Sequence, residues 1–346
     1  MIEMLLAGFP GLYESMFANV WIALALFAVG ALLLIKGGDW FVDSAVGIAK
    51  RFHIPEIIIG ATVVSIGTTL PEVMVSATAA VGGNGAIAYG NAIGSIICNT
   101  ALIAALTIAI RPAPVNQKAI KMPVIFFFVS AAIYLVAAYV FGAFELWLGI
   151  VMLAVFAVYM IFTIRQGFKN PVAAEGHGEE EKAEGSLLKD LIVLIVSAAL
   201  IAVGAELLEG SATSLATMAG IPTEVVGVTI VALCTSLPEL VTAITALAKG
   251  HGALSLGNII GANIFNLVLV SGVAVTLSPF TVPEGSTIFG YNTSLVMELP
   301  VMVGVMSLMT LPALFCKKLF RWQGVALLGI YVAFVVLQVL IALHII

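Results

Sequence analysis

Residues 54–99 read IPEIIIGATVVSIGTTLPEVMVSATAAVGGNGAIAYGNAIGSIICN, and residues 221–266 read IPTEVVGVTIVALCTSLPELVTAITALAKGHGALSLGNIIGANIFN. At a constant offset of 167 residues, 20 of these 46 positions are identical without a gap. Such repetition indicates an internal duplication, so the chain is expected to contain two related halves. The fold then depends on the surroundings of the two copies and on their relative direction.

The composition places both copies in a lipid bilayer. Of the 346 residues, 62% are hydrophobic and 10% are charged, and the mean hydropathy is +1.17. A water-soluble domain of this size needs more charge to cover its surface. The apolar runs are continuous rather than alternating, and a spanning helix takes about 20 such residues. We therefore expect an all-α integral membrane protein with ten transmembrane helices, near residues 18–38, 56–81, 86–110, 120–141, 145–164, 189–209, 223–247, 253–277, 295–314 and 322–345.

The basic residues predict the orientation of these helices. All fourteen Lys and Arg residues lie in or beside alternate loops, and the loops near 82–85, 142–144, 210–222 and 278–294 contain none. Loops rich in Lys and Arg stay on the cytoplasmic side of a cell membrane. Both termini are therefore predicted to be extracellular, and the polar segment 166–188 is predicted to be a cytoplasmic linker.

The two halves are predicted to be inverted relative to each other. Five spans, an odd number, separate equivalent positions, so the copies cross the membrane in opposite directions. The chain then divides into an N-terminal five-helix repeat (1–165), the linker, and a C-terminal five-helix repeat (189–346). Inverted repeats are typical of secondary transporters, whose substrate site lies at the repeat interface near the bilayer midplane. Duplication without transport is the alternative.

The linker contains an acidic run, 175–184, that could bind Ca²⁺ as a regulatory element. The run lacks the spacing of an EF-hand loop, which favours a solvated connection instead.

Each copy carries an acidic motif inside a span. Residues 67–72 read GTTLPE, and residues 234–239 read CTSLPE. A proline lacks an N–H group, so the helix is expected to break or kink there, and a Thr or Ser three residues before the glutamate also matches a capping box. In a bilayer, however, an ionised carboxylate in mid-span is costly unless it lines a polar cavity. Glu72 and Glu239 are therefore predicted to be ion ligands rather than simple helix caps.

A second motif follows in each copy, GNAIGSIICN at 90–99 and GNIIGANIFN at 257–266. Glycines four residues apart share one helix face and allow neighbouring helices to approach closely. Asn99 and Asn266 end the two motifs. Their buried amides could serve only as hydrogen bonds between helices, but their occurrence in both copies favours a ligand role.

Together the motifs describe a site made only of oxygen atoms. Carboxylates, hydroxyls, amide carbonyls and freed backbone carbonyls could supply the six to eight oxygens that Ca²⁺ takes, and no His or Cys pair is placed for Zn²⁺ or Cu⁺. Two carboxylates balance one Ca²⁺, two Na⁺ or two protons, so alternate occupancy of the pair would give exchange. The side chains in question are Thr68, Thr69, Glu72, Asn99, Thr235, Ser236, Glu239 and Asn266.

Other classes of function fit less well. A channel would need a continuous pore, which broken helices in inverted copies do not favour. An enzyme would need a nucleophile and base or a carboxylate pair of another arrangement, and the four His residues lie in loops or near span ends. No cofactor and no nucleic-acid partner are expected.

On these paired motifs, and on the stretch KGGDWFVD at 36–43, the chain resembles the cation/Ca²⁺ exchanger superfamily over essentially its whole length. The similarity is greatest to the prokaryotic sodium/calcium exchanger-like branch. The resemblance implies a core of spans 2, 3, 7 and 8, and long tilted spans 1 and 6 that slide across it. It also implies which residues line the cation sites: Thr68, Thr69, Glu72, Ser95, Asn99, Thr235, Ser236 and Glu239, with the backbone carbonyls of Ser65 and Ala232.

Two positions depart from the pattern of that superfamily. Asn266 stands where K⁺-dependent relatives carry aspartate, so K⁺ dependence is not expected. Ala262 stands where relatives often carry serine, which removes a hydroxyl from one of the Na⁺ sites. Na⁺ is the expected counter-ion for Ca²⁺, and H⁺ is the alternative.

Overall fold

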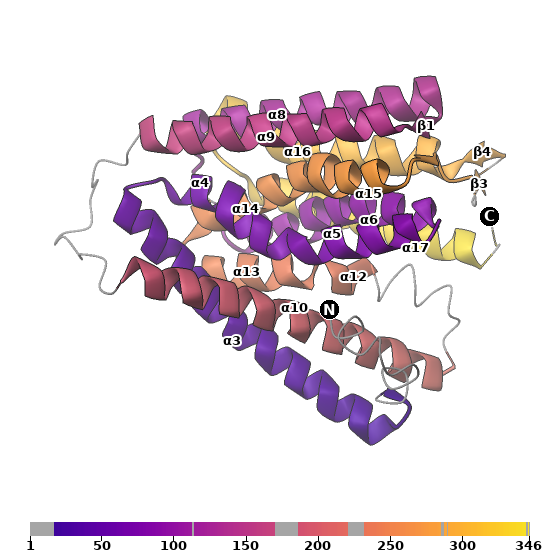
Figure 1. Cartoon of the computed structure of the whole chain (residues 1–346), viewed down its shortest axis with the longest axis horizontal. Helices are drawn as coiled ribbons and strands as arrows, with labels where there is room; N and C mark the ends of the chain where they lie inside the picture. The colour runs from indigo at the N-terminus through magenta and orange to yellow at the C-terminus, as the bar shows by residue number, and fades with distance from the viewer. Residues whose placement is uncertain are drawn as a thin grey trace.

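The computed structural model describes residues 17–112, 114–169, 186–220, 232–284, 287–288, 290–343 and 345. The described chain is almost entirely helical (Figure 1). The α-helices are α3 (Val20–Phe52), α4 (Glu56–Ile59), α5 (Ser65–Val81), α6 (Gly85–Cys98), α7 (Ala105–Ile110), α8 (Gln117–Val136), α9 (Leu146–Lys169), α10 (Leu187–Met218), α12 (Ala232–Thr235), α13 (Leu237–Ala248), α14 (Gly252–Phe265), α15 (Ser271–Leu277), α16 (Leu299–Cys316) and α17 (Arg321–Ala342). π-Helical segments join several of them: η1 (Gly60–Val64), η2 (Asn99–Ala104), η3 (Ala137–Phe141), η5 (Asn266–Val270) and η6 (Ser294–Glu298).

Nine helices in the described part of the chain are long and apolar enough to cross a membrane. The remaining predicted span, 223–247, is the seventh in chain order. Its described part consists of α12 and α13, and its first residues lie outside the described ranges. The prediction of an all-helical membrane protein is confirmed. Short strands, expected nowhere, occur only between helices: β1 (Ala143–Phe144) pairs with β2 (Phe280–Thr281), and β3 (Thr287–Ile288) pairs with β4 (Tyr291–Asn292).

The first and sixth spans are longer than hydropathy alone predicts. α3 has 33 residues and α10 has 32, whereas the apolar runs suggested 18–38 and 189–209. The apolar run ends where charged residues begin near Lys36, but no helix breaker follows until the end of α3. There His53 adopts the left-handed conformation (φ 54°) and Pro55 follows, so the helix ends at Phe52.

Equivalent helices of the two copies run in opposite directions. In Figure 1, α5 runs from left to right and α13 from right to left, while α6 and α14 reverse this relation. α9 ends and α10 begins at the left end of the molecule in this view. α9 extends to Lys169 and α10 begins at Leu187, so both helices reach into the segment 166–188, of which 170–185 lies outside the described residues.

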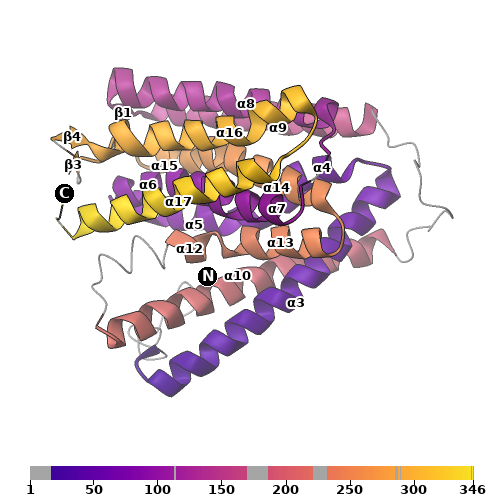
Figure 2. The ribbon, with the colours of Figure 1, turned by 180° about the vertical axis from the view of Figure 1, so that it is seen from behind.

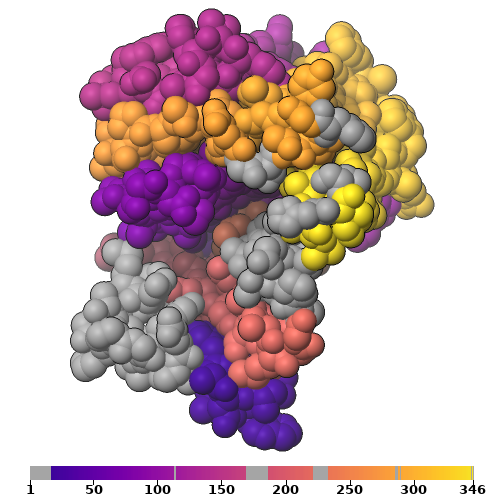
Figure 3. Space-filling model, turned by 90° about the vertical axis from the view of Figure 1, so that its right-hand side faces the viewer, coloured from indigo at the N-terminus to yellow at the C-terminus, as the bar shows by residue number. Residues whose placement is uncertain are grey.

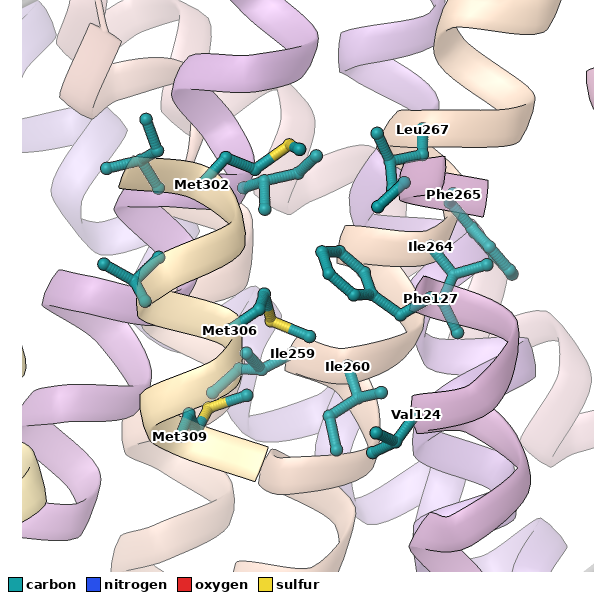
Figure 4. Close-up of a cluster of buried hydrophobic side chains, with 14 of the residues drawn as sticks. Val124, Phe127, Ile259, Ile260, Ile264, Phe265, Leu267, Met302, Met306 and Met309 are labelled. Carbon is teal, nitrogen blue, oxygen red and sulfur yellow. The ribbon is translucent and has the colours of Figure 1, made fainter. Parts of the chain in front are cut away.

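α14 lies at the centre of the molecule and is buried along nearly its whole length. One face carries Gly257 and Gly261, which lie against the backbone of Ile57 in α4 and Ala61 in η1. The isoleucines of α14 pack on α8 and α16. Figure 4 shows this apolar cluster, in which methionines of α16 face the isoleucines of α14: Val124, Phe127, Ile259, Ile260, Ile264, Phe265, Leu267, Met302, Met306 and Met309. The two glycines therefore bring α14 close to the first copy, and the isoleucines anchor it to the body.

The two long helices, α3 and α10, pack along each other at the lower edge of the molecule (Figures 1 and 2). They cross at Gly30 and Gly204, where a Cβ atom added to either glycine would lie 2.8 Å from the backbone oxygen of the other. Figure 3 shows the two helices beneath the body formed by the later spans. Their length and inclination agree with what the resemblance implied for spans 1 and 6.

Ion pairs tie this helix pair together and to the body. Arg51 at the end of α3 pairs with Asp190 at the start of α10 (Nη2–Oδ2 3.2 Å). Lys249, after α13, pairs with Asp43 (2.8 Å) and Asp39 (3.5 Å) on α3. The aspartates of the 36–43 stretch therefore bind a lysine of the second copy.

Candidate functional site

Glu72 lies on a helix that the proline before it does not interrupt. α5 runs from Ser65 to Val81 with Pro71 inside it, so of the break or kink expected at this proline the break is absent in the first copy. The carbonyl of Gly67 nevertheless loses its usual donor, because Pro71 has no N–H. The irregularity occurs one turn earlier, in the π-helical segment η1. Neighbouring packing thus holds the helix together across a residue that would break it in isolation.

In the second copy the break is present. α12 ends at Thr235, Ser236 is non-helical (φ −94°, ψ 9°), and α13 begins at Leu237 with Pro238 in its first turn. Ser236 occupies the N-cap position, but its side chain makes no capping hydrogen bond. The capping box predicted as an alternative role for the two glutamates is therefore absent in both copies.

The two carboxyl groups meet between the copies. Glu72 and Glu239 are both fully buried and lie close enough to interact electrostatically. Glu239 Oε1 accepts a hydrogen bond from Thr69 Oγ1 (3.5 Å), which joins α13 to α5. Two ionised carboxylates this close in a medium of low dielectric repel each other strongly. The pair is electrically balanced only with two positive charges beside it.

Several polar atoms around the pair receive no hydrogen bond from any described residue. Buried polar atoms in native proteins are almost always satisfied, so a cluster of unsatisfied ones fits a ligand of complementary charge. They are Glu72 Oε1 and Oε2, Glu239 Oε2, Ser95 Oγ, Ser236 Oγ, and the amide oxygens and nitrogens of Asn99 and Asn266.

The two asparagines occupy equivalent structural positions. Asn99 begins η2 and Asn266 begins η5, each at the point where an α-helix widens into a π-helix. η2 packs against α13, which carries Glu239, and η5 packs against α5, which carries Glu72. The segment that begins with each asparagine therefore packs against the glutamate-bearing helix of the other copy. π-Helical segments are frequent at functional sites because they displace backbone carbonyls from their usual partners.

Asn258, which the sequence reasoning did not assign to the site, connects the copies as well. Its Oδ1 accepts hydrogen bonds from Ser65 Oγ (3.2 Å) and Thr68 Oγ1 (3.3 Å), and its Nδ2 donates to Thr242 Oγ1 (3.1 Å). Ser65 Oγ also lies within hydrogen-bonding distance of the backbone carbonyls of Gly60 (2.8 Å) and Asn258 (3.0 Å). A hydroxyl that donates its single proton keeps its lone pairs able to bind a cation. The sequence did contain a sign of this role, because Asn91 and Asn258 are identical at the repeat offset. In the structure Asn91 Nδ2 donates a hydrogen bond to the backbone carbonyl of Glu72 (3.2 Å).

The remaining predicted residues are placed as follows. Ser236 is fully buried, and its hydroxyl has no hydrogen-bond partner among the described residues. Thr235 is partly buried, and Ala232 begins α12. Ala262 is fully buried and contributes no side-chain oxygen.

The chemistry of the donors is that of a hard cation site. Carboxylate, hydroxyl and amide oxygens predominate, and within the described ranges no group of three or more His, Cys, Asp or Glu residues is found. Ca²⁺ accepts such a mixed oxygen set in irregular geometry, and Zn²⁺ or Cu⁺ would call for His or Cys.

Inverted repeats that meet at buried, partly unsatisfied polar groups in mid-membrane define a secondary transporter. A family model described as sodium/calcium exchanger protein matches residues 22–165 and 189–340. The chain therefore belongs to the sodium/calcium exchanger family.

Individual relatives cover nearly all of the chain. The membrane protein MJ0091 of Methanocaldococcus jannaschii is 35% identical over 88% of this chain and 94% of its own length. The sodium/calcium exchanger MaX1 of Methanosarcina acetivorans is 30% identical over 90% of this chain and 97% of its own. A solved structure of the sodium-calcium exchanger NCX_Mj, soaked with Na⁺ and Sr²⁺, matches with a TM-score of 0.76 at 32% identity, over 91% of this chain and 98% of that one.

Proposed function

We propose that the protein is an antiporter that exchanges Ca²⁺ for Na⁺ across the cell membrane by alternating access. Its cation site comprises Glu72 and Glu239 with the surrounding oxygens of Ser65, Thr68, Thr69, Ser95, Asn99, Ala232, Thr235, Ser236 and Asn266. One five-helix repeat, 1–165, and its inverted copy, 189–346, each supply half of the site. Membership of the sodium/calcium exchanger family, and the name of the relative MaX1, support this choice of ions.

The observation that carries the proposal is the proximity of two buried carboxyl groups from oppositely oriented copies. Two ionised carboxylates without a bound cation would be very costly to hold in the low dielectric of the bilayer. One Ca²⁺ neutralises the pair, and so do two Na⁺ ions. Since the two cargoes need the same carboxylates, they exclude each other, which is the requirement for obligatory exchange.

Transport in a reconstituted system tests the proposal directly. Proteoliposomes loaded with Na⁺ and diluted into Na⁺-free medium are expected to take up radioactive Ca²⁺, because outward movement of Na⁺ drives inward movement of Ca²⁺. Liposomes loaded with choline instead should show uptake no faster than protein-free liposomes. The measurement is the initial rate of Ca²⁺ uptake.

The same assay distinguishes the other functions. Uptake driven by a pH gradient, with none driven by Na⁺, would replace this proposal with H⁺/Ca²⁺ antiport. Ca²⁺ flux without any counter-ion requirement would indicate a channel and would exclude exchange.

We also propose that both termini are extracellular and that the linker 166–188 is cytoplasmic. The chain carries its own reporter for this orientation: Cys316 is exposed at the basic end of α16, whereas Cys98 and Cys234 are buried. A membrane-impermeant maleimide is expected to leave Cys316 unlabelled in intact cells and to label it in inverted membrane vesicles.

A variant at the other end of the molecule provides the control. In a Cys316→Ser background, Thr287→Cys on the exposed strand β3 should be labelled in intact cells. Labelling of Cys316 by the impermeant maleimide in intact cells would show that the orientation is opposite to the one proposed.

A further inference from the structure

A second polar feature lies at the end of α14 away from the site. A cavity of about 90 Å³ opens between α4, α7, α14 and the connection after α7, and Arg111, Asn116, Gly252, Ala253 and Ser255 line it together with apolar side chains. One water molecule takes about 10–15 Å³ on this scale, so the cavity can hold a group of several heavy atoms.

The N-terminus of α14 faces this cavity without a cap. His251 occupies the N-cap position, but its side chain makes no capping hydrogen bond and instead contacts Glu56 (Nδ1–Oε1 2.8 Å). The first N–H groups of a 14-residue helix, those of Gly252 and Ala253, therefore have no partner among the described residues. Uncapped N–H groups and the helix dipole together favour a negative charge at this point.

The other copy of the repeat shows that this arrangement is not required by the fold. The position equivalent to His251 is Asn84, whose Oδ1 accepts a hydrogen bond from Ile87 N (3.4 Å) and caps α6. The duplicated helix is thus closed by its own side chain in the first copy and left open in the second.

Ser255 supplies an independent sign of a ligand. It lines the cavity, is 3% exposed, and its Oγ has no hydrogen-bond partner among the described residues. A buried hydroxyl without a partner is destabilising unless something binds it. The equivalent residue of the first copy is Ala88, so the backbone does not demand a serine here.

Arg111 supplies the positive charge. It lines the same cavity and is exposed to the surroundings on its other side. One Nη1 hydrogen bond goes to the carbonyl of Leu247 (3.4 Å), and the guanidinium group has five N–H donors in total. Glu56 does not line the cavity and is paired with His251.

From this geometry we infer that the cavity binds a phosphate group, through Arg111, Ser255 and the N-terminal N–H groups of α14. In the proposed orientation the site lies on the cytoplasmic face, at the end that also carries Lys249, Lys317 and Lys318. The phosphate belongs either to the headgroup of an anionic lipid of the inner leaflet or to free inorganic phosphate. Apolar walls formed by Ile57, Leu256 and Leu319 suit a group that continues into lipid.

The site is coupled to the cation site through α14 itself. Ser255 precedes Asn258 by about one helical turn, and Asn258 holds the hydroxyls of Ser65 and Thr68. A ligand that fixes the first turn of α14 is therefore expected to change the rate of Ca²⁺ transport as well as stability.

Thermal unfolding of the full-length protein tests the inference in two arms. In the first arm the protein is kept in a neutral detergent and titrated with inorganic phosphate, at constant ionic strength adjusted with NaCl. In the second it is placed in phosphatidylcholine nanodiscs with or without phosphatidic acid. A ligand that binds only the folded state raises the melting temperature in proportion to its occupancy. A rise in the first arm identifies free phosphate, and a rise confined to the second identifies the lipid headgroup.

Two substitutions and a matched control assign the effect to the cavity. Ser255→Ala and Arg111→Gln are each expected to weaken binding at least about ten-fold, since each removes a hydrogen bond to a charged group. Ser255→Ala introduces the residue that the first copy carries at this position, so the variant is expected to fold. Lys118→Gln alters an exposed basic residue that does not line the cavity and should leave binding unchanged.

Three results would overturn the inference. They are the absence of stabilisation in both arms, equal binding by the wild type and both cavity variants, and a loss in Lys118→Gln as large as in Arg111→Gln. The last of these would indicate general attraction to a basic surface. Because these readouts do not involve transport, they are independent of the Na⁺-driven Ca²⁺ uptake that tests the proposed function.

Discussion

Glu72→Gln and Glu239→Gln are each expected to abolish Ca²⁺ transport. Glutamine keeps the shape of the side chain but removes one of the two charges that balance a divalent cation. Removal of one partner from a buried set of interacting charges costs about 3–5 kcal/mol, equivalent to a loss of roughly 10²–10⁴-fold in cation affinity. The initial rate of Na⁺-driven Ca²⁺ uptake in proteoliposomes should therefore fall to the level of empty liposomes.

Another glutamate in the membrane offers a matched control. Glu298, in η6, accepts a hydrogen bond from Gln338 Nε2 (3.0 Å) on α17 and belongs to a part of the protein away from the carboxyl pair. Glu298→Gln should retain most of the transport activity. Normal uptake by either Glu72→Gln or Glu239→Gln, at comparable protein levels, would remove that residue from the cation site.

Gly257→Ala and Gly261→Ala are expected to have the next largest effect, this time on packing. A Cβ atom on Gly257 would overlap the carbonyl of Ile57, and one on Gly261 would lie 2.7 Å from Ala61 Cα and would also overlap Ser65 Oγ. Backbone atoms cannot rotate away, so α14 must separate from α4 and η1. Overpacking of this kind costs typically 1–3 kcal/mol, and a lower melting temperature in detergent measures it.

The substitution at Gly261 should also reduce transport, because it displaces the hydroxyl of Ser65 from Asn258. Gly304→Ala is the control, since Gly304 lies on an exposed face of α16 with no described atom within 4 Å of the added Cβ. Unchanged melting temperatures for both α14 variants would show that the two copies do not approach as closely as the structure indicates.

Much of the fold could be predicted from the sequence because a bilayer imposes simple rules on length, hydropathy and charge. The predicted span 56–81 coincides with the segment from α4 to α5, and the duplication with an odd number of intervening spans correctly gave opposite directions for equivalent helices. The lengths of α3 and α10 could not be predicted from hydropathy, because those helices continue past their apolar runs on tertiary contacts with the body.

The local backbone of the site was harder to predict. Pro71 and Pro238 stand in nearly identical motifs, yet one lies inside a continuous helix and the other follows a break. What differs is the packing around them, which a motif does not contain. The π-helical starts at Asn99 and Asn266 likewise leave no mark on hydrophobic periodicity, because one extra residue in a turn is too small a change to detect in a fully apolar segment. Asn258 was overlooked because its role depends on hydroxyls that lie 190 or more positions away in sequence.

The unequal strength of the attachments on α3 has a mechanical consequence. Close backbone contact at Gly30 and the ion pair between Arg51 and Asp190 hold α3 and α10 together as one rigid unit, so a displacement of one helix moves the other with it. Any movement of this helix pair past α13 has to break the ion pairs of Lys249 with Asp39 and Asp43. Those groups are partly hydrated, and ion pairs of this kind are worth about 1 kcal/mol or less. Two such pairs together bias the resting position of α3 and α10 by no more than about thirty-fold.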